Sequence, residues 1–111
     1  MTTLADQEFN LPVGEDVSPL SGDDLRAIHD RLGNNWQIVD ERYLEKEFSF
    51  KDFQSALDFI NKVGELAEEA DHHPELSFSW GRATIRISTH SIGGLSEADF
   101  IFAARCDRLS G

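Results

Sequence analysis

Cysteine is almost absent from this chain of 111 residues, and no long run of hydrophobic residues occurs in it. The single cysteine, Cys106, cannot close an internal disulfide bond, and no apolar stretch is long enough for a signal peptide or a membrane span. We therefore expect a protein that stays reduced in the cytoplasm. Cys106 falls in a helical pattern that favours a small buried hydrophobic residue, so we assign it no chemistry.

Basic residues are also scarce. Ten Lys and Arg stand against 21 Asp and Glu, which gives a formal net charge of −11. An acidic surface repels phosphate backbones and anionic membranes, so we expect neither direct nucleic-acid binding nor membrane binding. The length and the 40% hydrophobic content fit one domain, at residues 21–111. Residues 1–20 carry no sustained periodicity and are expected to form an extended N-terminal lead-in.

Three serines mark the expected starts of helices. Ser21, Ser49 and Ser96 each have an aspartate three positions later, which is the spacing of a capping box. At the second start, Phe48 and Phe53 are placed to form a hydrophobic staple. Apolar residues then recur at helical spacing: Leu25, Ile28 and Leu32; Phe53, Ala56, Leu57, Ile60, Val63 and Ala67; and Phe100, Ala103, Ala104 and Leu109.

Strand patterns fill the intervals between these helices. The expected strands are residues 36–39, 43–48, 76–80 and 83–88. They form two hairpins, and the second is the more strongly indicated because its apolar and polar residues alternate on both sides of Gly81. The element order αββαββα favours an α+β fold, with a four-stranded antiparallel sheet and three helices packed on one face.

Three of the four histidines lie in one stretch, at His72, His73 and His90. Histidine both gives and accepts a proton near neutral pH, so this clustering indicates proton transfer or metal binding. Pro74 cannot continue a helix and favours an extended His73, so the helix should end here and the two adjacent imidazoles should point to different sides. His29 stands alone on the first helix, and we interpret it as structural.

Carboxylates and glycines flank these histidines. Glu68 lies one helical turn before His72, and Asp71 is adjacent to it, so both can interact with an imidazole. His90 follows the last strand, and the nearby pair Gly93-Gly94 would let backbone approach a flat ligand closely. The sequence therefore predicts a cleft between these two junctions.

Other interpretations stay open from the residues alone. The histidines could simply end a helix and a strand, and Asp99 could be only the acidic residue of a capping box. A zinc site would use imidazole and carboxylate ligands, but the chain has no cysteine pair and no His-x-x-x-His pair on a helix. Hydrolysis by a nucleophilic serine would need a Gly-x-Ser-x-Gly turn, which the chain also lacks.

The spacing resembles that of a known family, the pterin-4a-carbinolamine dehydratases. Its members carry Glu-x-x-x-His-His-Pro, then an aromatic residue, then Thr-His, and then Gly-Leu-Ser/Thr-x-x-Asp. The matching residues are Glu68, His72, His73, Pro74, Trp80, Thr89, His90, Gly94, Leu95, Ser96 and Asp99. The resemblance extends over residues 20–109 and includes the expected order of elements.

The resemblance implies dehydration of 4a-hydroxytetrahydrobiopterin to quinonoid dihydrobiopterin, which recycles the pterin cofactor of aromatic amino-acid hydroxylases. It implies no metal and no organic cofactor. By resemblance, His72 and His90 transfer protons, and His73 binds and orients the pterin. Glu68 and Asp99 would fix the geometry of the imidazoles. The further residues implied at the substrate are Asp71, Pro74, Trp80 and Thr89.

The resemblance also implies an oligomer, because family members form homodimers or homotetramers by pairing sheets and packing helices. Two alternatives stay open within it. One is a non-catalytic regulatory or dimerisation module of the same fold. The other is a dehydratase-like role in another pterin pathway, such as molybdopterin metabolism. The presence of all three histidines favours the enzyme.

Overall fold

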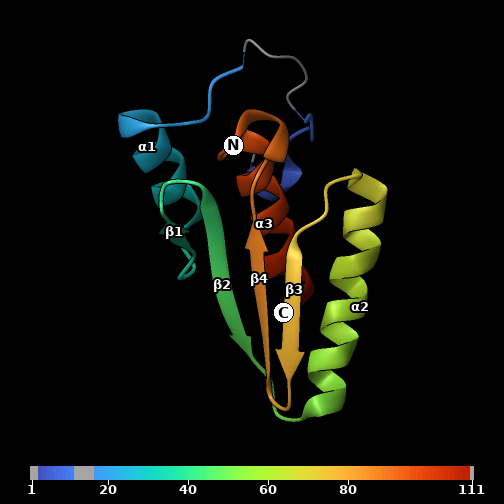
Figure 1. The fold of residues 1–111 in the computed structure, drawn as a ribbon. Coiled ribbons are helices and arrows are strands. Elements are labelled where there is room, and N and C mark those ends of the chain that lie inside the picture. Colours follow the sequence, from blue (N-terminus) through green and yellow to red (C-terminus); the bar gives the residue numbers. More distant parts are fainter. Residues whose placement is uncertain (1–2, 12–16, 111) are drawn as a thin grey trace.

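Four strands form one antiparallel sheet in the order β1-β2-β4-β3 (Figure 1). The computed structural model describes residues 3–11 and 17–110. Its elements are a 3-10 helix at Leu4–Asp6, α1 (Gly22–Leu32), β1 (Gln37–Val39), β2 (Tyr43–Ser49), α2 (Phe53–Ala70), β3 (Glu75–Ser79), β4 (Arg82–Ile87), a 3-10 helix at His90–Ile92 and α3 (Glu97–Ser110). The expected element order and α+β class are confirmed.

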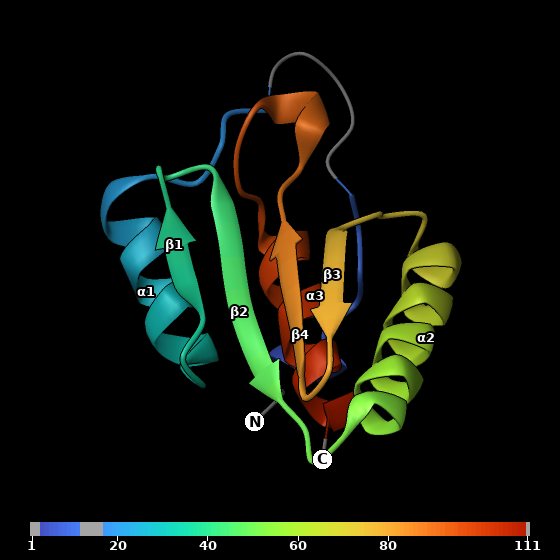
Figure 2. The same cartoon turned by 60° about the horizontal axis from the view of Figure 1, so that its bottom comes forward.

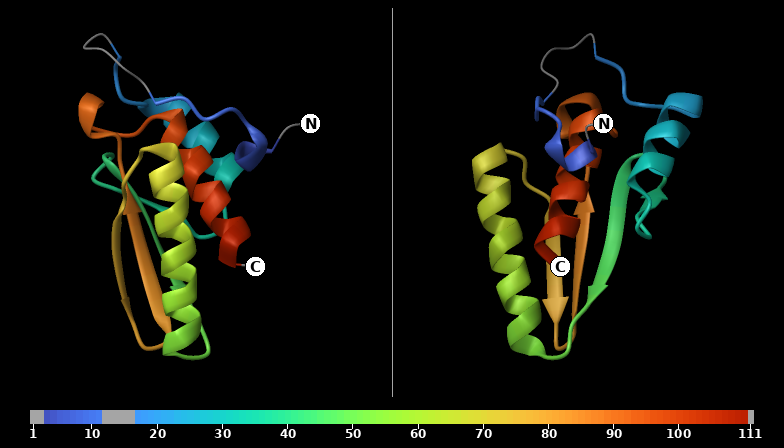
Figure 3. Two further views of the ribbon diagram at one scale, coloured as in Figure 1. Left: turned by 90° about the vertical axis from the view of Figure 1, so that its right-hand side faces the viewer. Right: turned by 180° about the vertical axis from the view of Figure 1, so that it is seen from behind.

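The helices cover one face of the sheet, as the side view in Figure 3 shows. Pairing of Leu44 with Ile87 and of Phe48 with Ala83 brings the apolar residues of β2 and β4 to the same face, where all are buried. The intervening residues carry charge and face away from the core: Glu45, Glu47, Arg82 and Arg86. The period of two in the sequence therefore assigns one face to the core and the other to a polar surface.

Helix α3 lies behind the middle of the sheet, between α1 and α2 (Figure 2). Its first turn forms where the sequence predicts it, because the N–H of Ser96 donates to Asp99 Oδ2 at 2.9 Å. Leu95 and Phe100, which flank this start, are both fully buried. The chain thus enters the core directly after Gly94, two residues before α3 begins.

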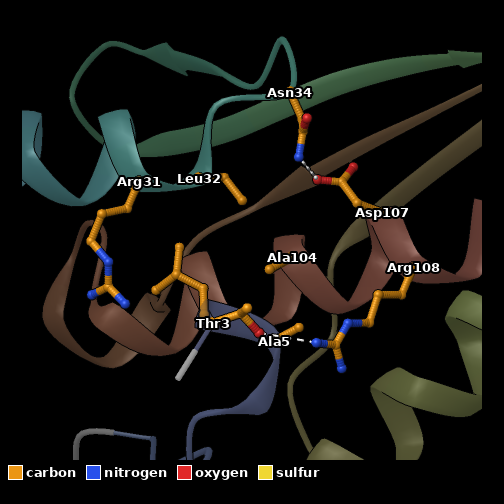
Figure 4. A pocket seen from close by; sticks show the side chains of 9 residues that line it. Thr3, Ala5, Arg31, Leu32, Asn34, Ala104, Asp107 and Arg108 are labelled. Carbon is orange, nitrogen blue, oxygen red and sulfur yellow. Dashed lines mark hydrogen bonds between the residues drawn. The ribbon is translucent and has the colours of Figure 1, made fainter. Parts of the chain in front are cut away.

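The last turn of α3 is fixed by a second carboxylate, that of Asp107. Its oxygens accept hydrogen bonds from Trp36 Nε1 at 3.0 and 3.1 Å, and from Lys46 Nζ at 2.8 Å. Asn34 Nδ2 donates to the same carboxylate at 3.2 Å, as Figure 4 shows. One side chain therefore ties α3 to the loop after α1 and to the first hairpin.

Helix α2 begins later than the sequence predicts. The residue that caps it is Asp52, whose side chain accepts a hydrogen bond from the N–H of Ser55 at 2.8 Å. Ser49, the expected cap, instead ends strand β2. The strand continues this far because Ser49 pairs with Arg82 of β4, and this tertiary pairing overrides the local capping spacing.

The expected staple across the start of α2 is also absent. Phe48 points into the core, and its ring lies 4.7 Å from that of Phe59, measured between centroids. Phe53 is 45% exposed, and its ring lies 5.4 Å from that of Phe78. The apolar side of α2 is completed by Phe59, which joins Ala56, Val63 and Ala67 as its buried residues.

The described part of the N-terminal lead-in packs against α3. We call residues 3–11 the N-terminal strap; in it, Leu4 and Ala5 are buried. Figure 3 (right) shows this blue segment crossing the red helix α3. The rest of the predicted lead-in includes residues 1–2 and 12–16, which lie outside the described residues. Within the described ranges, none of the helices has the length and apolar character needed to cross a membrane.

Candidate active site

The end of α2 aims His72 back toward the core. Asp71 adopts the left-handed conformation, with φ 51° and ψ 42°, and the N–H of His72 donates to the carbonyl of Ala67 at 3.1 Å. This is the Schellman pattern of helix ends, here without a glycine. Strand β3 begins at Glu75, so His72, His73 and Pro74 occupy the predicted helix-to-strand junction.

His72 is paired with the buried carboxylate of Asp99. The two atoms, His72 Nε2 and Asp99 Oδ1, lie 2.6 Å apart. His72 is 7% exposed and Asp99 is fully buried. An ionised carboxylate only accepts hydrogen bonds, so Nε2 is the donor in this pair. The sequence separates these residues by 27 positions, and the fold brings them together.

Two further groups hold the other oxygen of Asp99. Thr89 Oγ1 donates to Oδ2 at 2.8 Å, and the N–H of Ser96 does so at 2.9 Å. Thr89 has then used its only proton, so in its 2.8 Å contact with the Ser96 hydroxyl it is the acceptor. Asp99 therefore receives three donors from two connecting segments, the junction between α2 and β3 and the loop between β4 and α3. These hydrogen bonds fix the orientation of the imidazole that it holds.

Two aromatic rings flank the imidazole of His72. The ring of Phe102, on α3, lies 6.0 Å away and nearly perpendicular, at 89°. The ring of Phe9, on the N-terminal strap, lies 5.9 Å away at 48°. Both distances are within the usual range of aromatic contacts.

His73 and His90 line a common pocket of about 100 Å³ beside this pair. Its other lining residues are Tyr43, Glu75, Arg86 and Ser88. A second pocket, of about 160 Å³, shares Tyr43, Ser88 and His90 with it and adds Arg42, Gly93 and Gly94. The two pockets adjoin, so the structure brings both predicted junctions to one cleft. His72 is not among the residues that line either pocket.

The two pocket histidines are held loosely in comparison with His72. His73 Nε2 lies 3.6 Å from Glu68 Oε1, and its side chain is 55% exposed. His90 is exposed at the start of the short helix His90–Ile92. Behind it, the N–H of Thr89 donates to the carbonyl of Gly94 at 2.8 Å, which closes the loop between β4 and α3. Both imidazoles are therefore accessible to a ligand.

Trp80, which the resemblance implies at the substrate, is not at this cleft. It lies in the turn between β3 and β4, at the opposite end of the hairpin from His73, and is 70% exposed. Strand β3 lies between the two residues, and each of its extended residues advances the chain by about 3.3 Å. His29 is structural, as expected, since its Nε2 lies 2.6 Å from the carbonyl oxygen of Trp36.

Sequence patterns did not identify the polar residues of the pocket that come from the sheet. Arg86 Nε donates to Glu45 Oε2 at 2.7 Å, and this hydrogen bond raises the pKa of Arg86. The guanidinium of Arg86 also lies over the Tyr43 ring, 5.0 Å from its centroid. Only the pairing register of β2 and β4 brings these residues together, and no local spacing reports that register.

The described residues offer little for metal or thiol chemistry. Within residues 3–11 and 17–110, no group of three or more His, Cys, Asp or Glu is arranged to hold a metal ion. Cys106 is fully buried, and burial raises the pKa of its thiol far above the ordinary value. The thiol therefore stays protonated at neutral pH, as a structural cysteine does.

Comparison with known proteins gives this arrangement a family. The sequence model for pterin 4 alpha carbinolamine dehydratase matches residues 18–109. The chain belongs to this family. A relative from Rubrobacter xylanophilus named for the dehydratase is 50% identical over 109 residues, which are 98% of this chain and all of that protein. A second, from Alkaliphilus metalliredigens, is 41% identical over 97% of this chain and 96% of its own length.

Solved structures of the family include two similar chains. A transcriptional coactivator/pterin dehydratase from Brucella melitensis is 32% identical, with a TM-score of 0.78, over 85% of this chain and all of that one. A pterin dehydratase-like protein, identified as a RuBisCO assembly factor of the alpha-carboxysome, is 28% identical, with a TM-score of 0.59. That match covers 69% of this chain and 88% of the other. Proteins of this fold are thus described as a dehydratase, as a transcriptional coactivator and as an assembly factor.

Proposed function

We propose that this protein dehydrates 4a-hydroxytetrahydrobiopterin to quinonoid dihydrobiopterin, and so recycles the pterin cofactor of aromatic amino-acid hydroxylases. The observation that carries the proposal is the arrangement of three histidines. His73 and His90 line one cleft, and His72, which is adjacent to His73 in the chain, is paired with a buried carboxylate. Family membership supports the same reaction.

The reaction needs two proton transfers. One proton must reach the hydroxyl that leaves C4a, and another must be removed from a ring nitrogen of the pterin. Positioned acids and bases of this kind typically accelerate a reaction by about 10²–10⁴-fold. We assign these transfers to His72 and His90, and no metal or organic cofactor is required.

The Asp99 carboxylate suits His72 for proton transfer. It fixes Nε2 as the protonated nitrogen and stabilises the imidazolium when Nδ1 accepts a second proton. His72 does not line the pocket, and catalytic contacts often tighten only when substrate binds. His90 opens directly onto the pocket and can reach the pterin from the opposite junction.

His73 suits a binding role. It is exposed within the pocket, and Glu68 is near enough to orient its ring without fixing it. Glu75, Arg86 and Ser88 add donors and acceptors that a pterin ring can use. A homodimer or homotetramer acting in the cytoplasm completes the proposal.

The test is the dehydration rate of freshly generated 4a-hydroxytetrahydrobiopterin, followed by its ultraviolet absorbance. Wild-type protein should accelerate the reaction over the spontaneous rate. His72→Ala and His90→Ala should lower kcat by about 10²-fold or more, because each removes a proton-transfer group. His73→Ala should mainly raise KM, because it removes binding.

The matched control is His29→Gln, which alters the one histidine without a role in the proposed reaction and keeps a donor for the Trp36 carbonyl. It should leave both kinetic constants unchanged. A folded wild-type protein without acceleration would overturn the proposal. If His73→Ala lowered kcat and His72→Ala did not, the roles of these two residues would be exchanged.

A non-catalytic assembly or regulatory module is the second candidate. It is favoured by the likeness to the RuBisCO assembly factor, whose description calls it dehydratase-like. The same kinetic assay separates the two candidates. Repeating it with another tetrahydropterin carbinolamine tests whether the substrate belongs to a different pterin pathway.

A further inference from the structure

We propose that the N-terminal strap is part of the catalytic site, and that its Phe9 is a positioning residue for His72. The ring of Phe9 holds the imidazole against Asp99 and keeps water from the hydrogen bond between them. This inference rests on the proposed role of His72, and it adds to the site a segment that the family motif does not contain.

Two arginines of α3 fix the strap in place. Arg105 donates from Nε to the carbonyl of Ala5 at 3.1 Å, and from its terminal nitrogen to the carbonyl of Gln7 at 2.9 Å. Arg108 donates to Asp6 Oδ1 at 2.7 Å and to Thr3 Oγ1 at 3.0 Å. Bonds to backbone carbonyls fix the path of the chain irrespective of its side chains.

Apolar packing also holds the strap on α3. Leu4 and Ala5 are buried against α3. A pocket of about 320 Å³ adjoins the strap. Figure 4 shows Arg108 of α3 directed toward the strap, where it donates to Thr3 Oγ1. Residues of the strap and of α3 line this pocket, and no histidine does.

Phe9 continues from this anchored stretch to the imidazole. Its ring lies 5.9 Å from that of His72, while the Arg105 guanidinium lies 5.7 Å from the centre of the same ring. Phe9 is therefore placed between the arginine that anchors the strap and the histidine of the site. Together with Phe102 it leaves His72 only 7% exposed.

The chain returns to the site after the strap. The N–H of Leu20 donates to the carbonyl of Leu95 at 2.8 Å. Pro19 packs so closely on Gly94 that a Cβ at residue 94 would lie 2.8 Å from the Pro19 Cβ. Gly94 lines the pocket. The site is therefore contacted both by Phe9 of the strap and by Pro19.

The strap precedes the part of the chain that the family model matches, which begins at residue 18. The relative from Rubrobacter xylanophilus aligns over 98% of this chain. The family model therefore does not include Phe9, although the alignment with this relative extends over nearly the whole chain.

The experiment compares the full-length protein with its Phe9→Ala variant by two readouts. The first is exchange with water of the His72 Nε2 proton, observed by NMR as a downfield resonance. The second is kcat and KM for the carbinolamine. Phe9→Ala should speed the exchange and lower kcat by about two- to tenfold, the effect of one aromatic contact. KM should stay unchanged, because Phe9 does not line the pocket.

Three further variants keep the test specific. Phe53→Ala is the matched control, because it makes the same truncation at an exposed ring on α2 and should move neither readout. Phe9→Leu should restore most of both readouts by refilling the space. Arg105→Gln should move them in the same direction as Phe9→Ala, because it releases the two strap carbonyls while leaving Phe9 and His72 intact.

Wild-type exchange and kcat in a folded Phe9→Ala protein would overturn the inference. If that variant does not fold, wild-type values in Arg105→Gln would overturn it instead. The NMR readout needs no catalysis. A protein that shows slow, Phe9-dependent exchange but no dehydration would therefore refute the proposed function and leave Phe9 as the residue that positions His72.

Discussion

His72 and His73 are neighbours in the chain with opposite environments. His72 is 7% exposed and is fixed by a carboxylate that receives two other hydrogen bonds. His73 has a side chain that is 55% exposed, and its nearest carboxylate oxygen, on Glu68, is 3.6 Å away. The same residue type is thus held rigidly at one position and left adjustable at the next.

The backbone of the junction produces this difference. Asp71 reverses the chain through a left-handed residue, and the proline after His73 keeps that histidine extended. Successive side chains of an extended segment point to opposite sides. One imidazole therefore enters the core beside α3, and the other faces the cleft. A two-residue motif can supply both a fixed proton-transfer group and an adaptable binding group.

Removing the two carboxylates separately should give the largest contrast. Asp99→Ala leaves three buried donors without an acceptor and should lower the free energy of unfolding by about 3–5 kcal/mol. Glu68 is 81% exposed, so Glu68→Ala should change it by less than about 0.5 kcal/mol. Urea denaturation measures both. Equal losses in the two variants would contradict the distinction drawn between the two histidines.

A single donor to Asp99 should have an intermediate effect. Thr89→Val keeps the shape of the side chain, but it deprives Oδ2 of one hydrogen bond and the Ser96 hydroxyl of its acceptor. We expect a loss of about 1–2 kcal/mol, measured by the same denaturation. Thr89→Ser is the control, since it retains the hydroxyl. Stability equal to wild type in Thr89→Val would contradict a stabilising role for the hydrogen bond from Thr89 to Asp99.

The smallest effect should appear in acid, on the strap, whose Phe9 contacts His72. The hydrogen bond from Arg108 lowers the pKa of Asp6 from 3.8 to about 2. A depressed pKa means that this attachment is fully present above pH 3.8 and is lost as the pH falls toward 2. The protection of the Ala5 and Gln7 amides from exchange, relative to the intrinsic rate at each pH, should therefore fall as the pH is lowered from 3.8 to about 2. Arg108→Gln should remove this dependence, and its persistence there would assign it to another group.

Local patterns predicted most of the fold. Leu25, Ile28 and Leu32 are buried on α1 as their spacing indicates, and α3 begins after Ser96. The start of α2 was predicted incorrectly because Ser49 and Asp52 both satisfy local capping rules, and only pairing with β4 selects between them. Chain-local chemistry places elements well where no distant strand competes for the same residues.

The site was predicted only in part, for the same reason. The histidines, the junction and the acidic residue at the start of α3 are all visible as spacing. That Asp99 would hold His72 rather than another histidine depends on how α3 packs against the end of α2. Phe9 and Arg86 reach the site through tertiary contacts with α3 and β2, which leave no periodic signal in the sequence.

The carboxylates at the two ends of α3 have a consequence for how the site keeps its shape. Asp99 and Asp107 are eight residues apart, and each is bonded to groups outside the helix. A one-residue slip would turn an α-helix by about 100° and withdraw both from their partners at once. The apolar residues of α3 hold it against the sheet, and the two aspartates fix its rotation about its own axis. The orientation of the His72 imidazole therefore depends on the rotation of α3, because Asp99 moves with the helix.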